Sequence, residues 1–327
     1  NALRRSLVKS AGWLRSPTVA AAIAATASYR THLRSVAQKR KVQQGLRAEL
    51  DSCHLTIVTT AALPWMTGTA VNPLLRAAHL AQAGRRVTLV VPWLHPSEQH
   101  LVFAAGVRFE APSEQEDHIR SWLRERAGLS DAEFELRFYP SRYDMERGSI
   151  LPLGDISRFI DEEWGDICVL EEPEHLTWYH NGQNWRHRFK LVIGVVHTNY
   201  LYYAKTWDKG GELSARVVGK INEAVCRAYC DHVIKLSDTL QPLPRAVVCN
   251  VHGVRSEFLA VGQQVAEGPA PFPKGAYFLG KVLWAKGHRL LIDYLQLEGS
   301  MGLPPTHVDL YGSGEDIEEV RGEAGAK

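Results

Sequence analysis

The sequence predicts an α/β protein built on a parallel, doubly wound sheet, and three observations support that prediction. Apolar runs of strand length recur along the chain at intervals that leave room for helices. Apolar residues at helical spacing fill several of those intervals, which is the alternation that a parallel sheet requires. The length of 327 residues, of which 45% are hydrophobic and 23% charged, suits a folded protein of two domains.

The expected strands share aliphatic and β-branched residues and are bounded by turn-forming residues. They are 55–58, 87–91, 167–170, 191–196, 232–236, 246–251, 276–279 and 307–312. The expected helices are 73–82, 114–127, 156–164, 213–229 and 288–297. Gly84 closes the first of these helices, and Pro92 stops the strand that follows it.

A Gly- and Pro-rich stretch, GQQVAEGPAPFPKG, divides the chain and predicts an interdomain linker. The predicted parts are a basic N-terminal segment (1–50), a first Rossmann-like domain (51–261), the linker (262–275) and the start of a second Rossmann-like domain (276–327). A domain of that kind needs well over a hundred residues to cover both faces of its sheet, so we expect the second one to be truncated in this chain.

Charge is distributed unevenly along the chain, although the net charge is only +2. The first 48 residues contain ten Lys or Arg and neither Asp nor Glu, which predicts contact with an anionic surface, either lipid or nucleic acid. We interpret the segment as a basic interfacial helix anchored on a membrane by Leu3, Leu7, Trp13 and Leu14. A cleaved transit peptide and a solvated tail are the alternatives. No run of about 18 apolar residues predicts a membrane-spanning helix.

Five cysteines, an odd number without zinc-like spacing, are expected to be buried, reduced thiols. No Asp-x-Asp occurs, so a metal-bridged diphosphate is not indicated. Neither a metal nor a further cofactor is therefore expected. Glu171, Glu172 and Glu174 are possible acid/base groups, but Pro173 indicates a structured loop, and we assign no general base.

Two loops have the composition of ligand sites. The stretch TTAALPWMTGTAVNP, from Thr59 to Pro73, joins a buried strand to a helix, which is where doubly wound proteins bind phosphate or sugar. Lys281 ends a strand, and Lys286 stands before Gly287 and a helix, so two ammonium groups and the helix amides could bind a diphosphate. The YGSGED turn, with Gly312, is a weaker signal of the same kind.

These loops and the more distinctive stretches EEPEHLTWYHNGQ and VVHTNYLYYAK resemble the retaining GT-B glycosyltransferases, most closely the plastid galactolipid galactosyltransferases. The resemblance covers roughly Cys53 to Glu319. It implies a GT-B fold, in which two Rossmann-like domains face each other across a cleft. It also implies transfer of galactose from UDP-galactose to monogalactosyldiacylglycerol, forming digalactosyldiacylglycerol, by an enzyme bound peripherally to the chloroplast outer envelope.

The same resemblance suggests roles for individual residues. His197, at the end of a buried strand, is the expected catalytic group near the donor sugar. The expected donor-binding residues are Thr67, Gly68, Thr69, Lys281, Lys286 and Gly312. The expected acceptor-binding residues are Trp178, Tyr179 and Tyr200. The family's Glu-seven-residues-Glu element, which holds the donor's hydroxyls, is expected to lie beyond Lys327, so these residues leave donor specificity open.

Other functions remain open at this point. The chain could belong to another GT-B lipid or sugar glycosyltransferase, or to an inactive membrane-associated subunit with a degenerate transferase domain. A nucleotide-dependent oxidoreductase would need a GxGxxG turn and an acid about 20 residues further on. The stretch MTGTAVNP has neither feature, which argues against that class.

Overall fold

A computed structural model describes residues 52–145, 148–177, 183–207, 211–250, 252, 256–268 and 275–325. The chain divides into two compact units, Asn1–His252 and Gly253–Lys327, which are described separately below. The predicted basic segment, 1–50, and the predicted acceptor residues Trp178 and Tyr179 lie outside the described residues.

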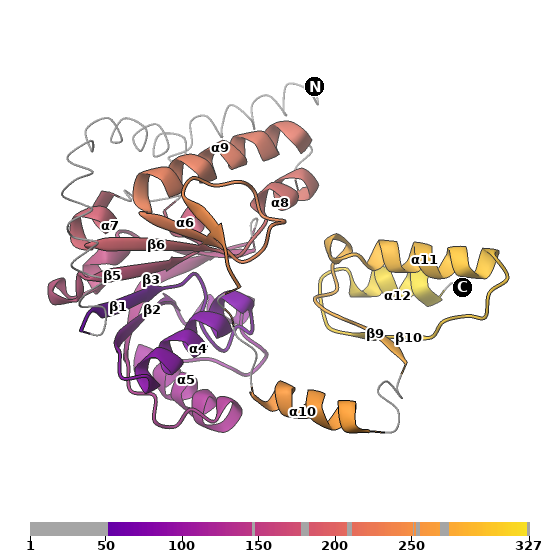
Figure 1. The fold of residues 1–327 in the computed structure, drawn as a ribbon, viewed down its shortest axis with the longest axis horizontal. Helices are drawn as coiled ribbons and strands as arrows, with labels where there is room; N and C mark the ends of the chain where they lie inside the picture. The colour runs from indigo at the N-terminus through magenta and orange to yellow at the C-terminus, as the bar shows by residue number, and fades with distance from the viewer. Residues whose placement is uncertain are drawn as a thin grey trace. The chain divides into compact units, whose positions relative to one another are not determined.

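The described residues of the first unit form an eight-stranded sheet in the order β4-β3-β2-β1-β5-β6-β7-β8 (Figure 1). Neighbouring strands are parallel except for β3 and β4, which form an antiparallel pair at one edge. The strands are β1 (His54–Val58), β2 (Arg86–Leu94), β3 (Glu135–Asp144), β4 (Ser149–Pro152), β5 (Ile167–Glu171), β6 (Leu191–Val196), β7 (His232–Lys235) and β8 (Ala246–Val248). The predicted doubly wound parallel sheet is thereby confirmed.

Helices cover both faces of this sheet (Figure 1). One face carries α4 (Gly68–Gln82) and α5 (Pro112–Ala127). The opposite face carries α6 (Pro173–Leu176), α7 (Gln183–Arg188), α8 (Tyr200–Trp207) and α9 (Gly211–Tyr229). Short 3₁₀ turns connect these elements: η1 (Gln99–Leu101), η2 (Ile156–Phe159) and η3 (Glu162–Trp164).

Side chains of the central strands point alternately to the two faces of the sheet and so divide the core into two layers. Ile57 of β1 and Val169 of β5 pack with the side chains of α4 and α5. Their neighbours Val58 and Leu170 point to the other face and pack with Leu176 and the residues around α7. Because successive side chains of a strand point to opposite faces, a strand covered on both faces must be apolar throughout. This is why the apolar runs predicted the central strands.

The structure differs from the expected elements in four places. β2 continues through Pro92 to Leu94, although this proline was expected to stop the strand. The predicted helix 156–164 is two 3₁₀ turns, because Ile160 between them has an extended backbone (φ −117°, ψ 130°). The sequence did not predict β3 and β4, since Pro140 and the charged residues within β3 argue against a strand. Part of the predicted linker 262–275 is helical, because α10 (Ser256–Glu267) continues through Gly262. A Cβ at Gly262 would meet nothing within 4 Å, so this glycine lowers helix stability without marking a break.

The second unit continues from α10 with a parallel pair of strands and flanking helices. Its elements are β9 (Ala276–Leu279), η4 (Trp284–Lys286), α11 (His288–Ser300), β10 (Val308–Tyr311) and α12 (Ile317–Gly325). The predicted strand 276–279 and the start of the predicted helix 288–297 agree with this order.

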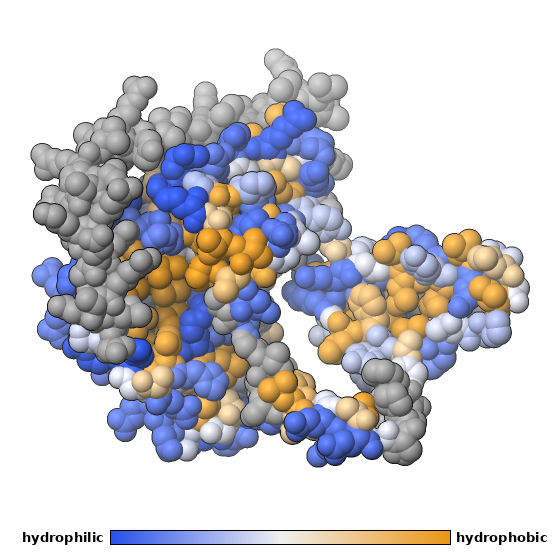
Figure 2. Space-filling model, viewed as in Figure 1, coloured by the Kyte–Doolittle hydropathy of each residue, from blue (hydrophilic) through white to orange (hydrophobic). Residues whose placement is uncertain are grey.

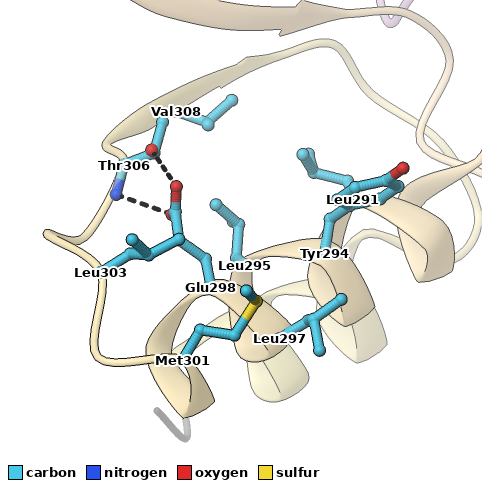
Figure 3. A pocket seen from close by; sticks show the side chains of 9 residues that line it. All are labelled: Leu291, Tyr294, Leu295, Leu297, Glu298, Met301, Leu303, Thr306 and Val308. Carbon is cyan, nitrogen blue, oxygen red and sulfur yellow. Dashed lines mark hydrogen bonds between the residues drawn. The ribbon is translucent and has the colours of Figure 1, made fainter.

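Large apolar side chains lie on the surface of the second unit, where Figure 2 shows orange over α11. Tyr294, Leu297 and Met301 are each more than half exposed, at 66%, 56% and 66%. A groove of about 450 Å³ runs beside them towards β10 (Figure 3). At its rim, Glu298 accepts hydrogen bonds from the Thr306 amide (3.0 Å) and hydroxyl (2.7 Å). Two strands and two helices do not provide enough surface to cover these side chains.

Within the part of the chain that the structure describes, no helix combines the length and the apolar composition that crossing a membrane requires.

Candidate active site at the strand ends

The carboxyl ends of β1, β5 and β6 meet at the point where the strand order changes direction. From β1 the sheet continues to β2 and β3 on one side and to β5 and β6 on the other. Ligands of doubly wound proteins bind at such a switch point, because the loops there diverge and leave a crevice. The strand-end residues Glu171 and His197 and the Thr59–Gly68 loop therefore lie at the expected place.

Glu171, the last residue of β5, is the centre of a polar cluster at this edge. Its side chain is completely buried, and the two carboxylate oxygens have different partners. Oε1 accepts a hydrogen bond from Arg76 Nη1 of α4. Oε2 lies 2.5 Å from Nε2 of His197, which follows β6 and is itself only 8% exposed. A carboxylate engaged by a guanidinium and an imidazole is compensated for its burial.

His252 extends the cluster on the far side of Arg76. Its Nδ1 lies 3.3 Å from Arg76 Nη2, and its ring centroid is 5.2 Å from that of His197. Burial, followed by the nearby His197 and Arg76, lowers the pKa of His252 below the ordinary value of 6.5. The neutral form of His252 is therefore favoured. We refer to Arg76, Glu171, His197 and His252 together as the Glu171 cluster.

Glu172 connects the three strand ends by a second set of bonds. Its Oε2 accepts from the Thr60 hydroxyl at 3.0 Å, and its Oε1 accepts from the Thr198 hydroxyl. The backbone of Glu172 is in the left-handed region (φ 62°, ψ 65°), which a residue with a side chain rarely adopts. Such strain is tolerated where the surroundings fix the residue, and it is common at functional sites. Pro173 then begins α6, so the loop expected at this proline is a single helical turn.

Glu174 lies deeper than its two neighbours. The residue is 1% exposed, and neither carboxylate oxygen has a hydrogen-bond partner among the described residues. Burial, and secondarily the nearby Glu172, raises the pKa of Glu174 well above its ordinary value. Burial therefore favours the protonated, neutral form of Glu174. All three glutamates are buried, at 0%, 4% and 1% exposure for Glu171, Glu172 and Glu174.

Tyr200, an expected acceptor-binding residue, directs its hydroxyl group into the protein. The hydroxyl oxygen lies 3.3 Å from Nδ1 of His175, whose Nε2 donates to the carbonyl oxygen of Ile150 at 2.9 Å. Burial raises the pKa of Tyr200 well above its ordinary value. The hydroxyl group therefore helps to hold α8 against α6.

The Gly68 loop leads from β1 into α4. The Thr59 hydroxyl donates to the carbonyl oxygen of Thr69, and the hydroxyl oxygens of Thr67 and Thr69 lie 3.1 Å apart. The amides of Ala70 and Val71 bond back to the Thr67 carbonyl, which begins the helix. Gly68 is exposed, and its amide lies at the positive end of a 15-residue helix. The three expected donor-binding residues of this loop therefore lie where an anion would be stabilised.

The donor-binding residues expected in the second unit lie on two loops that pack closely together. Val282 N donates to Ser313 O at 2.9 Å, which joins the loop after β9 to the loop after β10. A Cβ at Gly312 would lie 1.8 Å from the Gly280 carbonyl oxygen, so this contact requires glycine. Lys281 and Lys286 are both exposed on the first of these loops, close to the start of α11. Gly312 therefore supports the loop that carries the two lysines.

Comparison with known proteins identifies the relatives of this chain. No family model matches the sequence. Curated proteins match most of it. Digalactosyldiacylglycerol synthase 1 of Arabidopsis thaliana is 54% identical over 273 residues, which are 82% of this chain and 33% of the relative. Digalactosyldiacylglycerol synthase 1 of Lotus japonicus is 51% identical over 276 residues, 83% of this chain and 35% of the relative. Digalactosyldiacylglycerol synthase 2 of Arabidopsis thaliana is 50% identical over 273 residues, 82% of this chain and 57% of the relative.

The chain is homologous to the digalactosyldiacylglycerol synthases. The resemblance found in the sequence motifs is thus confirmed. The chain spans about a third of the length of the synthase 1 relatives and somewhat more than half of the synthase 2 relative. The names of these synthases all include the word chloroplastic.

Sequence reasoning missed several members of the polar site at the strand ends. Arg76 and His252 belong to the Glu171 cluster, and Thr60 and Thr198 hold Glu172. The one local signal was the position of Arg76, which directly precedes the buried residues Ala77 and Ala78 of α4. A charged side chain at such a position needs a partner of opposite charge. No pattern in the sequence connects His252 to residue 76, because 176 positions separate them.

Proposed function

We propose that the protein containing this chain transfers galactose from UDP-galactose to monogalactosyldiacylglycerol and so forms digalactosyldiacylglycerol with an α linkage. The observation that carries this proposal is the identity of 54% and 50% to proteins named as digalactosyldiacylglycerol synthases 1 and 2. The polar residues at the strand-end switch point are consistent with it, since a sugar nucleotide is a ligand of the kind such crevices bind.

On this proposal, each unit carries groups suited to binding a diphosphate. The amides at the start of α4, with the hydroxyl groups of Thr67 and Thr69, contribute donors and a partial positive charge from the first unit. Lys281 and Lys286 contribute full positive charges from the second unit. When the bond between galactose and diphosphate breaks, negative charge grows on the departing UDP. Groups arranged in advance to receive that charge lower the barrier.

His197 is the proposed catalytic group beside the transferred galactose. It follows a central strand, and its Nε2 is held by Glu171. A retaining transfer passes through a centre with oxocarbenium character, so the sugar must be oriented while the leaving group departs. A fixed imidazole next to the sugar suits that purpose better than a mobile one. The buried position of His197, at 8% exposure, means that little bulk water competes for it.

The acceptor is a membrane lipid, so the enzyme must meet it at a bilayer. We propose that the ten basic residues among the first 48 hold the protein on an anionic membrane surface as a peripheral enzyme of the chloroplast outer envelope. The word chloroplastic in the names of the relatives is consistent with this location.

A lipid-labelling assay tests the proposal. The longest natural form of the polypeptide is incubated with UDP-galactose carrying radiolabelled galactose and with vesicles that contain monogalactosyldiacylglycerol. We expect a labelled lipid that co-migrates with digalactosyldiacylglycerol in thin-layer chromatography and that loses its label to an α-galactosidase. The controls are vesicles without the acceptor lipid and competition by an excess of unlabelled UDP-glucose.

Each other result contradicts the proposal in a different way. Label in a different lipid, or transfer from UDP-glucose instead, would mean another GT-B glycosyltransferase activity. No labelled lipid from a folded protein that binds the vesicles would favour the inactive, membrane-associated subunit.

A further inference from the structure

The Glu171 cluster gives Glu171 a different role from that of an acid or base. Both of its oxygens are occupied, Oε1 by Arg76 and Oε2 by His197, and its side chain is completely buried. A general base must reach the proton that it removes. Glu171 can reach a ligand only through His197.

The direction of each hydrogen bond in the cluster follows from the chemistry of its members. A guanidinium only donates, so the Nδ1 of His252 accepts from Arg76 and its proton is on Nε2. A carboxylate only accepts, so the Nε2 of His197 donates to Glu171. With that proton on Nε2, the remaining lone pair of a neutral His197 is on Nδ1.

We infer that Glu171, itself held by Arg76, is a positioning residue that fixes His197 as the Nε2–H tautomer, so that Nδ1 can accept a hydrogen bond from a hydroxyl group of the transferred sugar. The identity of the sugar rests on the proposed function, whereas the tautomer and its cause do not. The arrangement corresponds to a general pattern in which a carboxylate behind an imidazole sets which ring nitrogen faces the ligand.

Arg76 has a defined part in this arrangement. It lies on α4, two helical turns after the Gly68 loop, and it joins Glu171 to His252 through two different nitrogens. Its charge balances that of the completely buried Glu171, while the Arg76 side chain itself is 16% exposed. The orientation of His197 is thereby coupled to the helix whose start forms the proposed donor site.

Nuclear magnetic resonance of the imidazole nitrogens tests the inference without any activity. Long-range proton–nitrogen correlation spectra of protein labelled with ¹⁵N-histidine distinguish the two tautomers, and His197→Ala assigns the His197 signals. We expect the Nε2–H tautomer for His197 in the unmodified protein. Glu171→Gln should give a mixture of tautomers, because an amide can donate as well as accept. Arg76→Lys keeps the positive charge and should keep the His197 tautomer, while it changes the His252 signals.

Kinetics provide the second measurement. Glu171→Gln should lower kcat about 10- to 100-fold, as loss of a residue that orients a functional histidine commonly does. The KM for UDP-galactose should change much less, because the diphosphate contacts are elsewhere. Glu116→Gln removes an ion pair with Arg120 on the surface of α5 and serves as the matched control, with unchanged kcat and unchanged histidine spectra.

The inference is wrong if His197 in the unmodified protein carries its proton on Nδ1, a result that no folding defect of a variant can produce. It is equally wrong if folded Glu171→Gln retains full kcat and the original tautomer. If the unmodified protein shows the Nε2–H tautomer but transfers no galactose, the inference about the cluster stands and the proposed function fails.

Discussion

Replacing Gly68 by alanine separates two reasons for which a glycine can stand at the start of a helix. One reason is conformational, but Gly68 is absent from the glycines with left-handed backbone, and a Cβ there would meet only the Asn72 amide nitrogen, at 3.5 Å. That distance is an ordinary contact. Alanine also favours helices by up to about 1 kcal/mol over glycine in a helix interior, and by less at a first turn. The free energy of unfolding of Gly68→Ala should therefore be unchanged or slightly higher.

The second reason is access of a ligand to the backbone, and it predicts a loss of donor binding. A methyl group beside the Gly68 amide would block a charge-assisted hydrogen bond to phosphate, which is worth about 1.5–3 kcal/mol. The KM for UDP-galactose should rise on the order of ten- to a hundredfold. Urea unfolding and initial-rate kinetics of Gly68→Ala measure the two effects separately.

Gly194→Ala is the contrasting variant, since a Cβ there would lie 2.7 Å from Pro173 Cγ and 2.9 Å from Cys230 Sγ. Overpacking of this kind costs about 1–3 kcal/mol of stability. An unchanged donor KM in a stable Gly68→Ala protein would refute the assignment of this loop to the donor.

Four further predictions concern other parts of the chain. Lys281→Ala and Lys286→Ala should each raise the KM for UDP-galactose about ten- to a hundredfold. The melting temperature should not change, since both residues are exposed. Normal donor kinetics in both variants would contradict their role. His197→Ala should lower kcat more than it weakens donor binding, as expected of a group that acts mainly in the transition state, and equal losses in both would argue against that role. Because the pKa of Glu174 is raised, the folded state keeps a proton that the unfolded state releases above pH 4.5. The free energy of unfolding should therefore fall as the pH rises from 4.5 towards the pKa of Glu174 in the folded state. In urea titrations Glu174→Gln should lack this decline, and the same pH dependence in both proteins would refute the prediction. Removal of residues 1–48 should reduce flotation with anionic vesicles at low salt, and equal flotation of both forms would show that another part of the protein docks.

Several features of this protein were determined by local sequence. The central strands are covered by helices on both faces, so they must be apolar at every position, and a continuous apolar run is visible without a structure. For the Gly68 loop, the small residues between a strand and a helix predicted the strand–loop–helix that the structure shows, and they also predict a ligand site there. Distinctive stretches such as EEPEHLTWYHNGQ carried the resemblance that the comparisons confirmed.

Tertiary structure decided which side chains act together. Glu171 bonds to Arg76, 95 positions away in the sequence, and to His197, 26 positions away. His252 reaches Arg76 across 176 positions. A parallel sheet brings the carboxyl ends of strands together whatever the length of chain between them, and the resulting contacts leave no periodic trace in the sequence. The residues that fix His197 therefore become visible only when β1, β5 and β6 lie side by side, because their interaction depends on that shared edge and not on neighbouring residues.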